Sequence, residues 1–337
     1  MNDIIVGLQY GDEGKGKITH YLINKKHYTH CVRFNGGPNA GHTLYINEKK
    51  VVTHQIPTGI INNLICVIGP NCVIDIDKLK VEIEMLENNG ISNIRDKLKI
   101  AYNAHIIEKK HIDEDKNNNK IGTTNSGIGP TYRDKVYRCG TRACDIGNKI
   151  LGCQVIDTYN ELNKPNINIL FEGAQGFMLD VNWGVYPYTT SSECLSYSVC
   201  STGIPFTKIR EVYGICKLYN TYVGTREFQP KEDLDLIELQ KLGEEFGSTT
   251  GRVRQCNWLN LDELIKATVM NGVSNLIINK CDVIDNLKIY KLYYKNELLT
   301  FKTLDEMKQY ITDVFTDLGS DNTINVNIIF SSNCYTL

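Results

Sequence analysis

The residues near the N-terminus that are best suited to chemistry are the glycines, lysines and acids of one short segment. Gly11 to Lys17 reads GDEGKGK and follows the apolar run Ile4 to Val6. A strand, a glycine loop and a helix in this order bind phosphate, because backbone N–H groups and the helix N-terminus point at the anion. The spacing is that of a P-loop, except that Ile18 replaces the usual Ser/Thr. We therefore predict a phosphate-binding loop.

Two acids and two lysines lie inside this loop. Lys15 and Lys17 add charge-assisted hydrogen bonds to a phosphate. Asp12 and Glu13 are unfavourable beside phosphates unless a cation or a chemical role compensates them. Asp12 can replace the missing P-loop hydroxyl as a ligand of Mg²⁺. We therefore expect this loop to take part in a reaction as well as in binding.

A second motif indicates which base the nucleotide carries. Asn279 to Asp282 reads NKCD and follows the apolar run Leu276 to Ile278. In GTP-binding proteins the Asp of N-K-x-D accepts hydrogen bonds from N1–H and the 2-amino group of guanine. Adenine lacks both donors, and leaving a buried carboxylate unpaired costs on the order of 10⁴-fold in selectivity. An ordinary GTPase switch is not favoured, since the chain lacks Ser/Thr after Gly16-Lys17 and a later D-x-x-G.

Several other segments are too rich in glycine and polar residues to be core. Their convergence predicts a site for more than one substrate. Arg252 and Arg254 are spaced to grip carboxylates. The segments are Asn35 to Thr43, Gly122 to Pro130, Glu172 to Gly176, Tyr188 to Ser192 and Gly247 to Arg254.

The elements that must position these loops alternate along the chain. Short apolar runs predict strands at 4–6, 31–34, 65–68, 167–170, 212–218, 276–278 and 326–330, and longer patterns predict helices at 77–87, 234–246, 262–270 and 304–318. Thr303 with Glu306, and Asn260 with Glu263, predict helix N-caps. The polar run 111–120 is predicted to be an exposed loop. The fold class is α/β: a mostly parallel central sheet flanked by helices, P-loop-NTPase-like, with inserted loops and small helical subregions, in one domain over 1–337.

Bulk properties exclude some classes of partner. A net charge of −2 over 337 residues gives no reason to expect nucleic acid or an anionic membrane. Continuous apolar sequence nowhere reaches the length of a membrane span. The chain has 12 cysteines. None forms a C-x-x-C pair, so we expect reduced thiols in a cytoplasmic protein rather than disulfides or a metal site.

Taken together, the motifs resemble those of the adenylosuccinate synthetase family, GTP-dependent ligases that join L-aspartate to IMP in the biosynthesis of AMP. The resemblance runs from Gly7 to about Asp285. The chain is shorter than usual members, chiefly in its second half, which implies a compact form of the archaeal and viral kind. The motifs that carry the resemblance are Gln9 to Lys17, N-A-G-H-T at 39–43, G-I-G-P at 127–130, E-G-A-Q-G at 172–176, T-S-S at 190–192, T-T-G-R at 249–252 and K-x-D at 280–282.

The resemblance implies a role for each matching residue. The expected catalytic residues are Asp12, His42, Lys15 and Gln175. Asp12 is the expected general base, and His42 is the expected donor on the acid side of the reaction. GTP is expected at Gly11, Glu13, Gly14, Lys15, Gly16, Lys17, Lys280, Asp282, Ser331 and Ser332. IMP is expected at Asn39, Thr124, Arg142, Gln175, Thr190, Val223 and Arg252. L-aspartate is expected at Thr249, Thr250, Arg252 and Arg254, and Mg²⁺ at Asp12 and the carbonyl of Gly41.

The resemblance also implies a two-step reaction and a homodimer. Removal of the N1 proton of IMP lets O6 attack the γ-phosphoryl group, and aspartate then displaces the new 6-phosphoryl group. Arg142 matches an arginine that reaches the IMP phosphate of a neighbouring subunit.

A few departures keep two alternatives open. Asn35 and Pro38 replace the common Gln and His, and Asn125-Ser126 stands where Gly-Arg is frequent. Compact viral relatives include enzymes that use dGMP and make 2-aminoadenylosuccinate, and we expect those to lack the Asp of the glycine loop. The retained Asp12 favours IMP. A GTP-binding protein without catalysis is disfavoured, because binding alone needs neither Asp12 nor His42.

Overall fold

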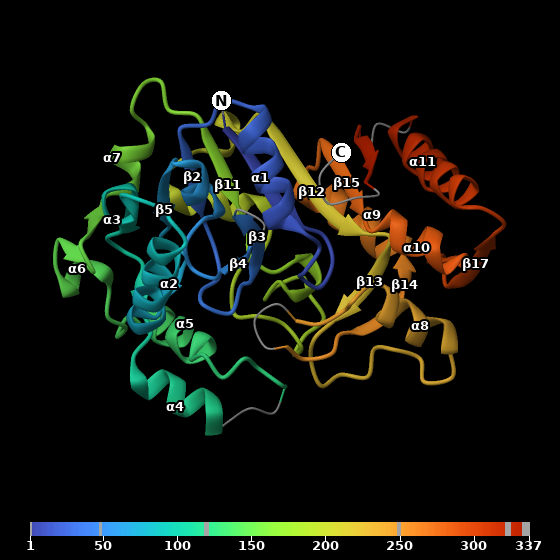
Figure 1. The fold of residues 1–337 in the computed structure, drawn as a ribbon, viewed down its shortest axis with the longest axis horizontal. Helices are drawn as coiled ribbons and strands as arrows, with labels where there is room; N and C mark the ends of the chain where they lie inside the picture. The colour runs from blue at the N-terminus through green and yellow to red at the C-terminus, as the bar shows by residue number, and fades with distance from the viewer. Residues whose placement is uncertain (1, 47–48, 118–120, 248–250, 321–324, 332–337) are drawn as a thin grey trace.

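A computed structural model describes residues 2–46, 49–117, 121–247, 251–320 and 325–331 (Figure 1). Its centre is a ten-stranded sheet in which every neighbouring pair is parallel except the edge pair β10–β9. This confirms the predicted mostly parallel sheet. In spatial order the strands are β18 (Asn327–Phe330), β15 (Asn275–Asn279), β12 (Glu211–Lys217), β1 (Asn2–Gly7), β11 (Ile169–Glu172), β2 (His30–Arg33), β5 (Ile65–Ile68), β7 (Leu98–Ala101), β10 (Cys153–Ile156) and β9 (Lys149–Ile150).

Helices cover the sheet along its length (Figure 1). They are α1 (Lys15–Lys25), α2 (Ile76–Asn88), α3 (Ile94–Lys97), α4 (Lys109–Asn117), α5 (Ile128–Tyr137), α6 (Ala143–Ile146), α7 (Thr158–Leu162), α8 (Leu234–Leu242), α9 (Leu261–Asn271), α10 (Cys281–Leu287) and α11 (Leu304–Ser320). Two predicted caps are confirmed: Asn260 Oδ1 accepts from Glu263 N at 3.1 Å, and Thr303 Oγ1 accepts from Glu306 N at 3.2 Å. Short 3₁₀ turns lie at Thr58–Asn62, Phe177–Leu179, Ser196–Thr202 and Phe206–Lys208.

Smaller sheets complete the fold. A four-stranded sheet has the order β13 (Tyr219–Tyr222), β14 (Gln255–Asn260), β16 (Tyr290–Tyr294) and β17 (Glu297–Phe301). Two pairs stand apart from it, β3 (His42–Ile46) with β4 (Lys49–Thr53), and β6 (Val73–Ile74) with β8 (His105–Ile106).

The central strand β1 shows why apolar runs form this sheet. All of its residues are buried. Successive side chains of a strand point to opposite faces, and Ile4 and Val6 accordingly pack in one hydrophobic cluster while Ile5 packs in another. Helices therefore have to cover both faces, as is usual for a parallel sheet.

The carboxyl ends of the parallel strands gather the polar loops at one edge of the sheet. The phosphate loop follows β1, the segment that begins at Asn35 follows β2, Gly173 follows β11, and Lys280 follows β15. Ligands of open α/β sheets bind at this edge. The topology therefore brings together motifs that are far apart in the sequence.

Two of the predicted elements are wrong in type or length. Residues 111–117 form most of helix α4, not an exposed loop, because His111 and Asp115 are four residues apart and both bury against the fold. The helix predicted over 234–246 ends at Leu242. After Gly243 the chain turns so that the side chain of Glu245 is buried among charged partners.

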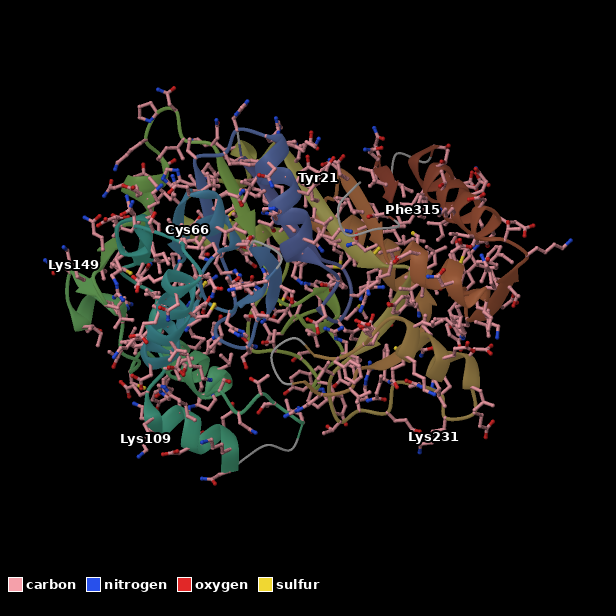
Figure 2. The ribbon with its side chains drawn as sticks, in the orientation of Figure 1. Tyr21, Cys66, Lys109, Lys149, Lys231 and Phe315 are labelled. Carbon is pink, nitrogen blue, oxygen red and sulfur yellow. The ribbon has the colours of Figure 1, made fainter. Side chains whose placement is uncertain are left out.

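Many charged side chains lie at the surface, and most of the described cysteines are buried. Figure 2 shows Lys109, Lys149 and Lys231 at the periphery, whereas Cys66 and Phe315 lie among packed side chains. The cysteines of the described residues are free thiols, eight of them buried. Within the described ranges, helices long and apolar enough to cross a membrane are absent.

Three buried histidines predict how stability depends on pH. Burial, together with nearby cations, lowers the pKa of His30, His42 and His105 to about 4 each. Their unfolded pKa is about 6.5, so between these values the unfolded chain binds more protons. Stability therefore decreases as the pH is lowered, by up to about 1.4 kcal/mol per pH unit for each histidine. Urea unfolding should show a lower midpoint at pH 5 than at pH 7.5. Replacing His30 with Gln should reduce this difference, and equal midpoints would contradict it.

Candidate active site

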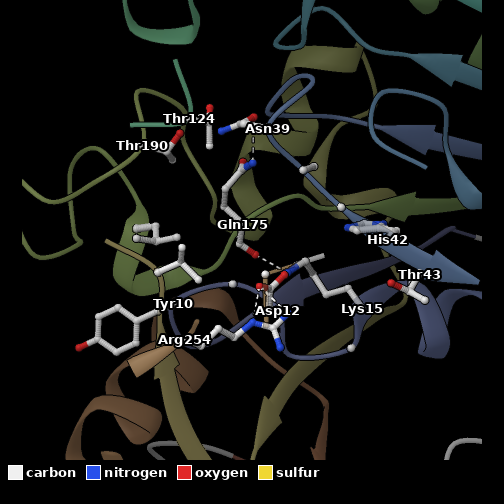
Figure 3. A pocket seen from close by; sticks show the side chains of 18 of the residues that line it. Tyr10, Asp12, Lys15, Asn39, His42, Thr43, Thr124, Gln175, Thr190 and Arg254 are labelled. Atoms are coloured by element: carbon white, nitrogen blue, oxygen red, sulfur yellow. Dashed lines mark hydrogen bonds and ion pairs between the residues drawn. The ribbon is translucent and has the colours of Figure 1, made fainter. Parts of the chain in front are cut away.

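One large cavity lies at the carboxyl edge of the sheet, with a volume of about 1300 Å³. In the close view, Asn39, Thr124 and Thr190 gather at one end, and Asp12, Lys15 and Arg254 lie at the other (Figure 3). Such a volume suits several substrates bound together. Most of the predicted site residues line it: Gly11, Asp12, Gly14, Lys15, Gly16, Lys17, Asn39, Gly41, His42, Thr124, Gln175, Thr190, Val223, Arg252, Arg254 and Lys280.

The phosphate loop joins β1 to α1 as predicted. Gly14 has a φ of 94° and is the N-cap of α1, and no side chain caps that helix end. The first N–H groups of α1 therefore remain available to an anion. A Cβ at Gly16 would lie 2.9 Å from the Cβ of His42, so glycine is needed there for His42 to approach the loop.

Glu13 stabilises the conformation of the phosphate loop through hydrogen bonds to its buried side chain. Its buried carboxylate accepts from the backbone N–H of Gly11 at 2.9 Å and from Lys15 Nζ at 2.6 Å. Lys15 also donates to the carbonyl of Gln175. Glu13 is not among the residues that line the cavity. It can therefore support GTP binding by shaping the loop and holding Lys15.

Asp12 faces the cavity and shares an arginine with a buried acid. Its carboxylate, 26% exposed, receives Nε and Nη2 of Arg254 at 2.8 Å each. Arg254 Nη1 lies 2.5 Å from Glu245 Oε2, and Lys217 Nζ lies 3.2 Å from both Glu245 oxygens. Burial alone raises the pKa of Glu245, but Lys217 and Arg254 outweigh it and lower that pKa to about 2. The four charges form a compensated chain that fixes Arg254 beside Asp12.

The substitution Glu245→Gln should destabilise the protein and disturb Arg254. Removing one partner of a buried ion pair costs about 3–5 kcal/mol, because the other charge stays buried and unpaired. We expect a lower urea midpoint for Glu245→Gln. The matched control Glu244→Gln changes an exposed neighbour and should keep the wild-type midpoint. Equal midpoints for both variants would contradict the ion-pair account.

His42 belongs to a second buried charge cluster. Its Nδ1 donates to Glu172 Oε1, and Arg33 Nη2 lies 3.4 Å from the same oxygen. Burial raises the pKa of Glu172, but Arg33 and His42 lower it to about 2. Burial and then Arg33 lower the pKa of His42. At neutral pH the imidazole is therefore neutral, with Nδ1–H held by Glu172 and a lone pair on Nε2.

Amide and hydroxyl groups occupy the other end of the cavity. Gln175, at a φ of 56°, donates from Nε2 to Asn39 Oδ1 at 3.2 Å. Thr124 and Thr190 lie near this pair (Figure 3). This group of neutral donors and acceptors suits a polar ligand such as a nucleotide.

The NKCD segment also contacts the phosphate loop. Asn279 Nδ2 donates to the carbonyl of Glu13 at 2.8 Å, and Lys17 Nζ lies 3.2 Å from Ser331 Oγ. Lys280 lines the cavity, whereas Asp282 is exposed in the first turn of α10 and is not part of that lining. A guanine-binding role for Asp282 therefore remains a prediction.

Among the described residues, a further predicted site residue is not brought to this cavity. Arg142 is exposed at the N-cap of α6 and does not line the cavity of its own chain. Thr249, Thr250 and Ser332 lie outside the described residues. Among the residues described, groups of three His, Cys, Asp or Glu that could hold a metal ion are absent.

Sequence reasoning missed several side chains that hold the site together. Glu172, Glu245 and Lys217 were given no role, although each is buried and charged. Asp115 lies in the run predicted to be a loop, yet it lines the cavity. The i, i+4 spacing of His111 and Asp115 could have revealed the helix, whereas the partners of Glu245 are not readable from spacing.

The fold and the cavity together define a nucleotide-binding α/β enzyme with a P-loop-like phosphate site. A family model described as adenylosuccinate synthetase matches residues 4–151 and 148–315. The match extends beyond the limits predicted from motifs, at both ends. The chain belongs to the adenylosuccinate synthetase family.

Relatives of known function agree with this. The adenylosuccinate synthetase of Carboxydothermus hydrogenoformans is 40% identical over 343 positions, covering 86% of this chain and 79% of the relative. That of Azobacteroides pseudotrichonymphae is 37% identical over 383 positions, covering 98% of this chain and 90% of the relative.

Solved structures show the same fold. A fully ligated adenylosuccinate synthetase from Plasmodium falciparum superposes with a TM-score of 0.85 at 28% identity, covering 98% of this chain and 97% of that one. A succinoaminodeoxyadenylate synthetase of cyanophage S-2L, bound to dGMP and dATP, gives a TM-score of 0.72 at 24% identity, over 93% of this chain and 98% of that one. The second likeness concerns the fold alone.

Proposed function

We propose that this adenylosuccinate synthetase joins L-aspartate to IMP, with GTP as the phosphoryl donor, and releases adenylosuccinate, GDP and phosphate. The observation that carries the proposal is that one cavity contains the phosphate loop, Asp12, His42 and Arg254. Binding of GTP alone would require neither an acid inside the phosphate loop nor a paired arginine beside it. The reaction belongs to the purine pathway that supplies AMP.

The first step activates the C6 oxygen of IMP. Asp12 removes the N1 proton, which makes O6 nucleophilic, and O6 attacks the γ-phosphorus as GDP leaves. Lys15 and the N–H groups of α1 stabilise the charge on the transferring group. The N–H groups of the loop support this role, because no side chain caps that helix end.

His42 acts as a hydrogen-bond donor to the oxygens of the transferring phosphoryl group. Its ring is neutral before substrates bind, since burial and Arg33 lower its pKa. The negative charge of a γ-phosphate favours the imidazolium, so Nε2 gains a proton and donates a hydrogen bond to the oxygens between purine and phosphorus, which stabilises their charge as O6 leaves with the phosphate in the second step. Glu172 holds Nδ1–H and thereby fixes the ring. Gln175 orients the purine from the opposite end of the cavity.

The second step forms the new C–N bond. The amino group of aspartate attacks C6, the phosphate leaves with O6, and the nitrogen loses a proton. Thr249, Thr250, Arg252 and Arg254 bind the carboxylates of aspartate. The contact between Arg254 and Asp12, at 2.8 Å, supports a common reaction point for base and amino acid. Water has to be excluded between the two steps.

The residues at the phosphate loop fit a Mg²⁺ ion. Mg²⁺ prefers oxygen ligands and is usually held by one or two carboxylates together with substrate phosphates. The carboxylate of Asp12 and the backbone of Gly41 both line the cavity and offer such oxygens. When bound, Mg²⁺ would neutralise charge on the phosphates of GTP. Because Arg254 contacts Asp12, a bound Mg²⁺ and the guanidinium would share the same carboxylate.

The choice of IMP over dGMP rests on Asp12. Supplying GTP, Mg²⁺ and L-aspartate with either IMP or dGMP tests it by phosphate release and by the succinyl-purine product. We expect product with IMP. Product with dGMP alone would reverse the substrate assignment, and no product with either would overturn the reaction.

The same proposal extends to assembly and form. We place Arg142 at the IMP phosphate of a second subunit in a homodimer, and its exposure supports this.

We take residues 1–337 as one domain, because one sheet and one hydrophobic cluster run from Ile4 to Phe315. We regard the chain as a compact form of the family. The match to the Carboxydothermus relative spans 343 positions but includes only 86% of the 337 residues of this chain. The other positions of the match therefore belong to internal segments of the relative that this chain lacks. Free thiols fit a cytoplasmic location.

A further inference from the structure

Helix α4 carries an acid that no step of the reaction uses. Asp115 is 8% exposed and reaches the wall of the cavity. Asp113, on the same helix, is exposed. Burying a carboxylate is costly unless its oxygens are paired, so the partners of Asp115 indicate what it does.

Both oxygens of Asp115 hold the loop that leads into helix α5. Oδ1 accepts from Thr123 Oγ1 at 2.9 Å, and Oδ2 accepts from the backbone N–H of Gly127 at 2.9 Å. One carboxylate therefore joins the two ends of the segment 123–127. Between those ends lies Thr124, which lines the cavity.

Helix α4, which carries Asp115, is itself held firmly against helix α5. His111, one turn before Asp115, is fully buried and its Nε2 lies 3.0 Å from Asp134 Oδ2 on α5. Thr131 of α5 contacts the same imidazole at 3.1 Å. Helices α4 and α5 are thus fixed to each other, and Asp115 transmits that fixed position to the loop between them.

The loop presents the N-terminal end of α5 to the cavity. Gly127 is the N-cap of α5, with a φ of 74° and no side-chain cap, and Ile128 and Gly129 line the cavity. A Cβ at Gly127 would lie 2.9 Å from the backbone nitrogen of Ile112, so the turn is packed tightly on α4. A helix N-terminus in this setting suits a phosphate.

We propose that Asp115 is a positioning residue for IMP: it holds Thr124 and the start of α5 in the arrangement that binds the 5′-phosphate. This inference rests on the proposed function, in which Thr124 binds IMP. Asp115 acts through the loop, because both of its oxygens are engaged by Thr123 and Gly127.

Simple electrostatics makes the opposite prediction. A carboxylate near a phosphate repels it, so neutralising Asp115 would tighten IMP binding if charge alone mattered. If Asp115 positions the loop, neutralising it weakens IMP binding, because the amide of Asn cannot accept both hydrogen bonds. The sign of the effect therefore separates the two accounts.

The test compares Asp115→Asn with Asp113→Asn, the same change on the same helix at an exposed position. For Asp115→Asn we expect the KM and the equilibrium Kd of IMP to rise about tenfold, the factor for loss of one charge-assisted hydrogen bond. The KM values of GTP and aspartate should change little, and Asp113→Asn should match wild type. Inosine, which lacks the phosphate, should bind both variants as it binds wild type.

Several outcomes would overturn the inference. Unchanged or tighter IMP binding by Asp115→Asn would do so, as would an equal loss of inosine binding or parallel rises in all three KM values, which indicate general destabilisation. Absence of product from the wild-type protein would instead contradict the proposed function. The two failures are therefore distinguishable.

Discussion

Replacing Asp12 with Asn should abolish most turnover while leaving GTP binding almost unchanged. General-base catalysis contributes about 10²–10⁴-fold, so we expect kcat to fall by about 10³-fold or more. Asn is the appropriate substitution because Asp12 has a φ of 58°, a conformation that Asn tolerates better than Ala does. Steady-state kinetics and a direct GTP titration give the two quantities.

The GTP titration decides what Asp12 does. If Asp12 acts mainly as the base, GTP affinity should stay within about threefold of wild type, which corresponds to less than about 0.7 kcal/mol. A large loss of GTP affinity would mean that Asp12 mainly holds metal or shapes the loop. Asp113→Asn, an exposed acid outside the loop, serves as the control for the loss of one carboxylate.

Replacing Glu172 with Gln should reduce both stability and turnover. Arg33 would keep its charge in a buried position without an anion, which costs about 3–5 kcal/mol. Gln has only one acceptor oxygen, whereas Glu172 offers one to His42 Nδ1–H and the other to Thr58 N–H, so one of these groups would lose its acceptor and face an NH₂ group. Because a general acid needs the correct tautomer and orientation, we also expect kcat to fall by about 10²-fold. Urea unfolding and steady-state kinetics measure the two effects.

A double variant separates the two effects of Glu172. In Arg33→Met/Glu172→Gln the unpaired buried charge is gone, and such replacements often restore stability. Turnover should stay low, because the Gln amide still cannot accept from His42 and Thr58 together. Recovery of wild-type kcat in the double variant would show that Glu172 matters only for folding.

The sequence was sufficient for those parts of the fold that depend on local pattern. The apolar run at β1 followed by glycines predicted the phosphate loop, and buried runs predicted most of the inner strands. The four-stranded sheet was missed because its strands carry mixed residues, such as Tyr219 to Tyr222, without a clear apolar period. Helix α4 was missed because its exposed acids and lysines outnumber its buried residues.

The site could be predicted as a set of loops but not as a set of contacts. Asp12 and Arg254 are 242 positions apart in the chain, and their ion pair follows from the topology of the sheet rather than from any spacing. The same holds for Arg33 and Glu172, which meet because β2 and β11 are neighbours, and for His42, which reaches Glu172 from the start of β3. Residues that support the site from behind, such as Glu245 and Lys217, have no motif of their own.

The central claim is that O6 of IMP is phosphorylated before aspartate replaces it. IMP labelled with ¹⁸O at C6, incubated with GTP, Mg²⁺ and L-aspartate, tests this most directly through the mass of the released phosphate. We predict one ¹⁸O in the phosphate for each adenylosuccinate formed. Unlabelled phosphate together with ¹⁸O in water would contradict the account, because it would mean that O6 leaves without phosphorylation.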